Sequence, residues 1–136
     1  MPAEGDQRLI VVYDDDCGFC KWSVAHTLAW DRRRRLRPVG LSSAEADRLL
    51  VGMSEEERQD SFHVVEPGGR VLSAGAAAPL VAERLPGGRP LAALGRALPG
   101  LTERAYRVIS GRRTPLGRLV TAGAAARARR RIAERS

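Results

Sequence analysis

The first third of the chain alternates between short apolar runs and apolar positions at helical spacing. Residues 9–13 form an apolar run rich in β-branched side chains, which predicts a strand buried on both faces. Between residues 17 and 31 the apolar positions recur every four residues, so we expect a helix with an inward stripe of Cys20, Val24 and Leu28. Residues 35–39 predict a second strand, and Pro38 indicates an edge strand or a strand end.

Two short helices are predicted next. Either Ser42 or Ser43 is a suitable N-cap for a helix that runs to residue 50. Ser54 and Glu57 have the spacing of a capping box, which predicts another helical turn.

The C-terminal part is predicted to be mainly helical. Residues 76–85 favour a helix that ends at the Pro-Gly-Gly run of residues 86–88. A helical stripe follows, interrupted at residues 99–100, and we expect it to pack on the preceding elements through Leu91, Leu94, Leu98, Leu101, Ala105 and Val108. From residue 115 an Ala-rich basic helix is predicted, with about the last fifteen residues frayed, as exposed termini often are.

The predicted order of elements is strand, helix, strand, helix, hairpin, helix. The first two strands should be parallel and joined by a right-handed crossover. Residues 62–65 and a strand from residue 71 flank a Pro-Gly-Gly-Arg turn, which favours an antiparallel hairpin. We therefore predict a single-domain α/β protein with a thioredoxin-like mixed sheet flanked by helices. Its core spans about residues 8–85, with a helical extension at about 90–113 and a basic tail at 114–136.

The chain carries a formal net charge of +7, almost entirely through arginine. A basic surface attracts anionic partners such as nucleic acid, acidic lipid headgroups or acidic proteins. With only 4% aromatic residues, base stacking is poorly provided, and a solvated face is the simplest interpretation of the basic cluster formed by Arg127, Arg129, Arg130, Arg131 and Arg135. No apolar run approaches the roughly 18 residues that span a bilayer, and the polar N-terminus lacks the features of a secretory signal. We expect a cytoplasmic protein.

The two cysteines, Cys17 and Cys20, carry the strongest chemical indication. A disulfide between them would close a very small loop and would constrain the unfolded chain little, so a structural staple is disfavoured. Cys17 falls where the first strand feeds the first helix, and the free N–H groups of a helix terminus stabilise an anion such as a thiolate and lower its pKa. We predict Cys17 as the nucleophile and Cys20 as the resolving thiol, with a protein or small-molecule disulfide or thiol as substrate and no cofactor.

Three aspartates precede the cysteines. Their negative charge opposes a thiolate at Cys17. Asp14 is a candidate to exchange a proton with Cys20, and Asp16 is a candidate helix cap or catalytic residue. The simpler alternative is that all three are cap and turn residues.

The segment from Tyr13 to Cys20 resembles the signature of the DCC family of thiol-disulfide oxidoreductases, which is named for its Asp-Cys-x-x-Cys motif. Asp14, Asp16 and both cysteines match the motif, whereas Asp15 stands where the family usually has glycine. The resemblance extends over about residues 9–113 and includes Asp31, His63-Val64-Val65, Gly75-Ala76 with Ala78, and Tyr106. It implies a thioredoxin-like fold and dithiol redox chemistry.

Other functions remain open at this point. The apolar strand with Asp14 and Asp16 resembles the first motif of haloacid-dehalogenase-like phosphatases, which use Mg²⁺. Lys21 is the sole lysine, and no later acidic pair follows a strand. Both cysteines with His26 and His63 supply four possible zinc ligands. A basic zinc- or nucleic-acid-binding module without redox catalysis is therefore the alternative.

Overall fold

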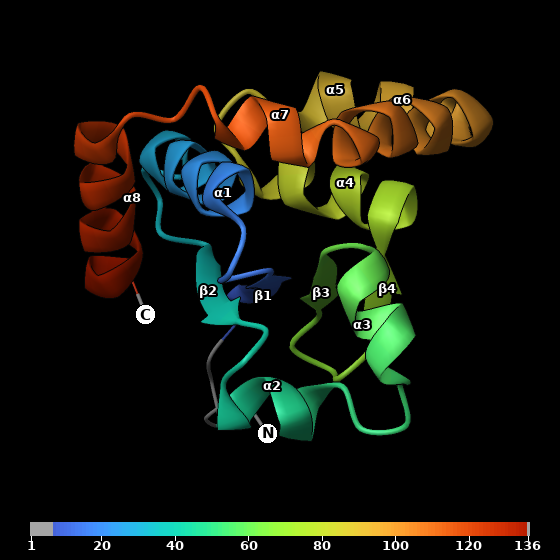
Figure 1. Ribbon diagram of the computed structural model, residues 1–136. Coiled ribbons are helices and arrows are strands. Elements are labelled where there is room, and N and C mark those ends of the chain that lie inside the picture. Colours follow the sequence, from blue (N-terminus) through green and yellow to red (C-terminus); the bar gives the residue numbers. More distant parts are fainter. Residues whose placement is uncertain (1–6, 136) are drawn as a thin grey trace.

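The computed structural model describes residues 7–135. In chain order its elements are β1 (Leu9–Tyr13), α1 (Gly18–Trp30), β2 (Leu36–Gly40), α2 (Ala44–Leu49), α3 (Glu55–Asp60), β3 (His63–Val65), β4 (Val71–Ser73), α4 (Ala74–Arg84), α5 (Arg89–Ala97), α6 (Pro99–Gly111), α7 (Arg113–Gly117) and α8 (Ala122–Arg135), as Figure 1 shows. Ser43 and Ser54 cap α2 and α3, as predicted, by accepting N–H bonds from Ala46 and Glu57. α4 begins two residues earlier than predicted.

The four strands form one mixed sheet in the order β2-β1-β3-β4. β1 is parallel to β2 and antiparallel to β3, with Val11 opposite both Pro38 and Val64. β3 and β4 form the predicted antiparallel hairpin, and Pro38 lies in an edge strand as expected. The predicted α/β, thioredoxin-like mixed sheet flanked by helices is confirmed.

The two faces of the sheet are covered by different helices (Figure 1). Because side chains alternate along a strand, Leu9, Val11 and Tyr13 of β1 enter a core that also contains Leu28 of α1 and Ala77 of α4. On the other face, the β1 side chains pack toward α2 in a cluster made of Ile10, Val12, Val39, Leu41, Ala46, Leu50 and Val65. The first strand is thus buried on both faces, as its composition predicted.

The expected packing of the leucine stripe is wrong. Leu91, Leu94, Leu98, Leu101 and Val108 are between 45% and 61% exposed. Small residues instead bring α5 and α6 onto α4: Ala92 is buried, and the Gly75 backbone approaches Glu103 so closely that a Cβ there would lie 2.7 Å from the Glu103 Cα. Close approach of helices through small residues leaves the larger side chains at the outer surface.

The expected fraying of the C-terminus is also wrong for residues up to 135. α8 lies beside α1 (Figure 1) and buries Ala128 and Ile132. Arg135 is 9% exposed and forms an ion pair with the fully buried Asp31, with 2.5 Å between Nη2 and Oδ2. Of the five clustered tail arginines, Arg135 is therefore a core residue, whereas Arg127, Arg129, Arg130 and Arg131 are exposed. No helix among residues 7–135 is both long and apolar enough to cross a membrane.

Candidate active site

The site is built on the turn between β1 and α1. Cys17 is the N-cap of α1, with extended backbone angles (φ −103°, ψ 117°), and its sulfur accepts a hydrogen bond from the Cys20 N–H at 3.3 Å. The suggestion that Asp16 caps this helix is therefore wrong, because the cysteine that follows it takes that position. A thiol cap is uncommon, since sulfur is a weaker acceptor than the oxygens of Ser or Asp.

Neither Cys17 nor Cys20 is in a disulfide, and both are partly buried. Cys17 occupies the tip of α1, and Cys20 lies in the first turn. Farther along the helix, Val24 packs against the core and Leu28 is 2% exposed. The predicted inward stripe therefore exists, and Cys20 stands at its accessible end.

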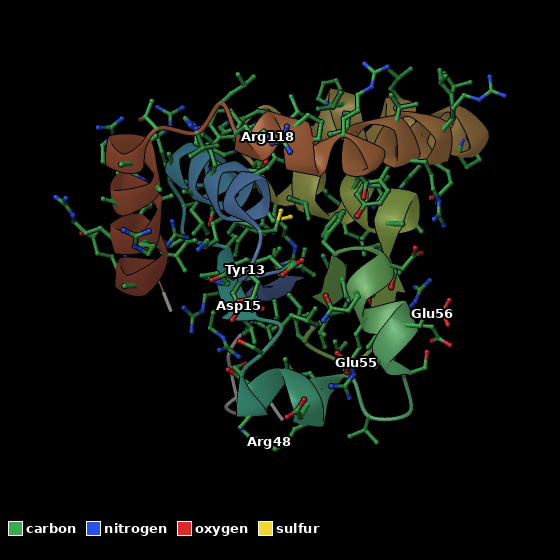
Figure 2. All side chains as sticks on the ribbon, viewed as in Figure 1. Tyr13, Asp15, Arg48, Glu55, Glu56 and Arg118 are labelled. Atoms are coloured by element: carbon green, nitrogen blue, oxygen red, sulfur yellow. The ribbon has the colours of Figure 1, made fainter. Side chains whose placement is uncertain are left out.

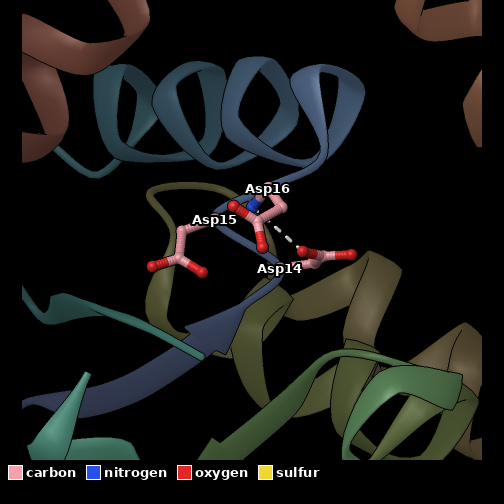
Figure 3. A group of neighbouring side chains, drawn as sticks. All are labelled: Asp14, Asp15 and Asp16. Carbon is pink, nitrogen blue, oxygen red and sulfur yellow. Dashed lines mark hydrogen bonds between the residues drawn. The ribbon is translucent and has the colours of Figure 1, made fainter. Parts of the chain in front are cut away.

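The aspartates differ in their contacts (Figure 3). One carboxylate oxygen of Asp14 accepts the Asp16 N–H at 3.0 Å, and the Asp14 carbonyl accepts the Cys17 N–H at 3.3 Å. These bonds close the turn that delivers the chain from the sheet to the helix. The Asp16 side chain is exposed, whereas Asp14 is partly buried.

Asp15 fastens the same turn to the neighbouring strand connection. Its carboxylate accepts the Ser42 N–H at 3.2 Å and is also hydrogen-bonded by the Ser42 hydroxyl. Gly40 makes room for it, because a Cβ at residue 40 would collide with the Asp15 carboxylate. Asp15 stands where the DCC motif has glycine. Among the non-glycine residues of the described chain, a positive φ occurs at Arg34 and Ala74 and not at Asp15. The turn therefore accepts an aspartate without left-handed backbone strain.

Tyr13 ends β1 immediately before this turn, and Figure 2 shows it above Asp15. Burial, together with the nearby Asp15 carboxylate, raises the pKa of the Tyr13 phenol. Tyr13 therefore contributes a neutral ring to the site.

A cavity of about 350 Å³ adjoins Cys20. It is enclosed by β1, α1, α4 and α6, together with residues near the start of β3. Its walls are mostly apolar and include Val24, Leu28, Val81, Leu85 and Ile109, whereas Asp14 supplies a carboxylate. This cavity cannot be predicted from the sequence, because its walls come from segments as far apart as β1 and α6 and no local spacing indicates that they meet.

The candidate zinc ligands are not brought together. His63 is buried in β3, where Nδ1 bonds the Ser73 hydroxyl at 2.6 Å and Nε2 bonds the Arg58 carbonyl at 3.1 Å. His26 is exposed on α1 and packs edge-on to Trp22. Within residues 7–135, the ligand-type groups that lie within 4.8 Å of one another are Asp14, Asp15 and Asp16, and no cysteine or histidine belongs to that group.

The family model described as DCC1-like thiol-disulfide oxidoreductase matches residues 11–119. The match includes residues 11–13 of β1, the Asp-Asp-Asp-Cys turn, both cysteines and every later element to the end of α7. No curated protein matches the chain, and no solved structure does.

Proposed function

This chain belongs to the DCC1-like thiol-disulfide oxidoreductase family, and we propose that Cys17 and Cys20 carry out dithiol–disulfide exchange. The observation that carries the proposal is the position of the two sulfurs at one helix terminus: Cys17 caps α1, and Cys20 follows one turn later. The N–H groups at the start of a helix point toward such a cap and favour negative charge there.

The proposed reaction has two steps. The Cys17 thiolate attacks one sulfur of the substrate disulfide, the substrate S–S bond breaks, and the leaving sulfur takes the electron pair and a proton. Cys20 then loses its proton and attacks the Cys17 sulfur, which releases the second thiol. The protein dithiol is oxidised to a Cys17–Cys20 disulfide and the substrate is reduced to two thiols. An external dithiol returns the protein to its reduced form.

Asp14 is the proposed proton acceptor for Cys20. Both residues line the same cavity, and the Asp14 carboxylate is held by the Asp16 N–H at 3.0 Å. Asp16 takes part through its backbone, so its exposed side chain is dispensable in this scheme. Asp14→Asn should slow the resolving step about 100-fold or more, which is the range typical of a lost general base. Asp16→Asn should change it little.

Trapping of a mixed disulfide tests the roles of the cysteines. Reduced Cys20→Ser should attack a disulfide once and then retain the adduct, because no resolving thiol follows. Cys17→Ser should form no adduct through residue 17, since a serine hydroxyl is far less acidic than a thiol. Intact-mass spectrometry and peptide mapping would read out both variants. An adduct that accumulates on Cys20 in Cys17→Ser, at the rate seen for Cys17 in Cys20→Ser, would reverse the assignment.

A further inference from the structure

The cavity beside Cys20 indicates which disulfides the site accepts. We propose that it binds the apolar arm of a small, uncharged disulfide substrate, and this inference rests on the exchange chemistry proposed above. The cavity is continuous with the reactive helix tip, because its walls include Cys20 and Phe19 of the first turn of α1 as well as Asp14 of the preceding turn.

The walls favour an apolar occupant. No arginine, lysine or histidine is among the described residues that line the cavity, so a carboxylate on the substrate finds no cationic partner there. The Asp14 carboxylate adds repulsion toward an anion. Two wall hydroxyl groups already have hydrogen bonds: Tyr106 Oη accepts the Phe62 N–H at 3.0 Å, and Thr27 donates to the Ser23 carbonyl at 2.9 Å. An anionic arm is therefore disfavoured by charge, although the protein as a whole is basic. An arm of either charge would also lose hydration against the mostly apolar walls.

The size of the cavity suits a small organic group. An apolar cavity of about 150 Å³ holds benzene, and ligand pockets begin at about 300 Å³. At about 350 Å³, this cavity has room for an alkyl or aromatic arm of roughly six carbon atoms with space to spare. Water in the cavity would have few polar partners, so its displacement by such an arm is favourable.

The proposed placement fits the two-step exchange. The apolar arm occupies the cavity beside Cys20, and the disulfide lies toward the helix tip, where Cys17 can attack. The Cys17 sulfur is 3.3 Å from the Cys20 nitrogen, so both thiols lie at the same end of α1, within one helical turn of each other. Attack by Cys17 breaks the S–S bond, and Cys20 then closes the protein disulfide. The two substrate thiols are released.

A matched pair of neutral disulfides tests the preference. Fully reduced protein is mixed with bis(2-hydroxyethyl) disulfide or with hexyl 2-hydroxyethyl disulfide, and single-turnover oxidation is followed after acid quenching. We expect the second-order rate constant to be at least tenfold higher for the hexyl compound, after division by the same ratio measured for free dithiothreitol. A corrected ratio below two would overturn the proposal.

Two variants that fill the cavity test whether the preference for the hexyl compound arises there. Ala78→Leu on α4 and Ser110→Leu on α6 place bulk in the cavity from different walls, and Ala29→Leu on the exposed face of α1 is the matched control. We expect either filling variant to bring the corrected ratio below two, mainly by lowering the rate with the hexyl compound. Ala29→Leu should keep the tenfold preference. If both folded filling variants retain it, the arm does not bind in this cavity.

A thioether separates this inference from the proposed function, because hexyl 2-hydroxyethyl sulfide cannot exchange. Its binding to the reduced wild-type protein should shift the amide NMR signals of Leu28 and Val81, which line the cavity. If neither disulfide reacts but the thioether shifts these signals, the exchange function fails and the cavity site stands. If both disulfides react equally and the thioether leaves the signals unmoved, the exchange function stands and the inference fails.

Discussion

The two ends of α1 are built in opposite ways. At the N-terminal end a sulfur caps the helix, both thiols are partly exposed, and the 3.3 Å contact between Cys17 and the Cys20 N–H is a weak hydrogen bond. At the C-terminal end the Asp31 carboxylate is fully buried and accepts the N–H groups of Arg35 and Leu36 at 3.0 and 2.9 Å. Arg135 completes that end by pairing with the same carboxylate.

The difference shows how a reactive helix tip is held in place. The weak hydrogen bond to the Cys17 sulfur leaves that sulfur available to a substrate, so the helix is held in place by contacts other than those of its reactive sulfur. Arg135 also donates to the Leu28 and Leu36 carbonyls at 3.0 and 3.3 Å, and so joins α8 to α1 and to the start of β2. The closed end of α1 therefore anchors the helix, and the open end supplies the thiols.

The largest expected effect comes from removing the buried ion pair at the C-terminal end of α1. Arg135→Ala leaves the buried Asp31 carboxylate without its cation and should lower the free energy of unfolding by about 3–5 kcal/mol. Urea denaturation would measure the loss, and Arg131→Ala, at an exposed position on the same helix, should cost less than about 0.5 kcal/mol. In the absence of urea, where both variants are folded, the rate of disulfide exchange should stay within twofold of the wild-type rate. Equal losses for the two variants would remove the contrast between the ends of α1.

The second prediction concerns the turn at the open end. Gly40→Ala drives a methyl group into the Asp15 carboxylate, which holds the turn to Ser42, and should cost about 1–3 kcal/mol. Gly68→Ala is the control, because an added Cβ there meets no atom within 4 Å. In an Asp15→Ala background the cost of Gly40→Ala should fall below about 0.5 kcal/mol, as a double-mutant cycle would show. An undiminished cost would place the clash elsewhere.

The third prediction concerns the loss of stability in acid, which we assign to His63 in the sheet and to neither end of α1. Burial lowers the pKa of His63 below its usual 6.5. The unfolded chain therefore binds a proton first as the pH falls, so the stability from neutral His63 is complete above about pH 6.5 and is lost as the pH falls through that value toward the folded-state pKa. The slope of this loss is at most about 1.4 kcal/mol per pH unit.

Urea unfolding between pH 5 and pH 7 would measure that slope. His63→Gln should flatten it. A wild-type slope in the His63 variant would assign the acid response to another group.

Much of the sheet and the helix tip could be predicted because the relevant information is local. The apolar run of β1, the four-residue stripe of α1 and the Pro-Gly-Gly-Arg turn each lie within one element or its turn. The role of Arg135 was not predictable in this way, because its partner Asp31 lies 104 residues earlier and a terminal arginine ordinarily faces solvent. The predicted packing of the leucine stripe was wrong for a related reason. Periodicity identifies an apolar face, but Gly75 and Ala92 decide which faces of α4, α5 and α6 pack together.

The smallest expected effect concerns the N-terminal end of α1. It tests whether the protein can be stabilised there without making the thiols less accessible. Gly18 is the first residue of α1 and is exposed, and its φ is not in the left-handed region. Apart from its chain neighbours and the backbone of the helix itself, an added Cβ there meets no atom within 4 Å. Gly18→Ala should therefore raise the free energy of unfolding by about 0.4–1 kcal/mol, mainly by restricting the unfolded chain. Because an added Cβ lies more than 4 Å from the Cys20 side chain, the rate of mixed-disulfide formation in a Cys20→Ser background should stay within twofold of the same background with Gly18. Urea denaturation and the trapping assay would give the two numbers. A stabilised variant that exchanges much more slowly would mean that the glycine is needed for flexibility at the tip, and that the weak contacts there do not by themselves keep the thiols accessible.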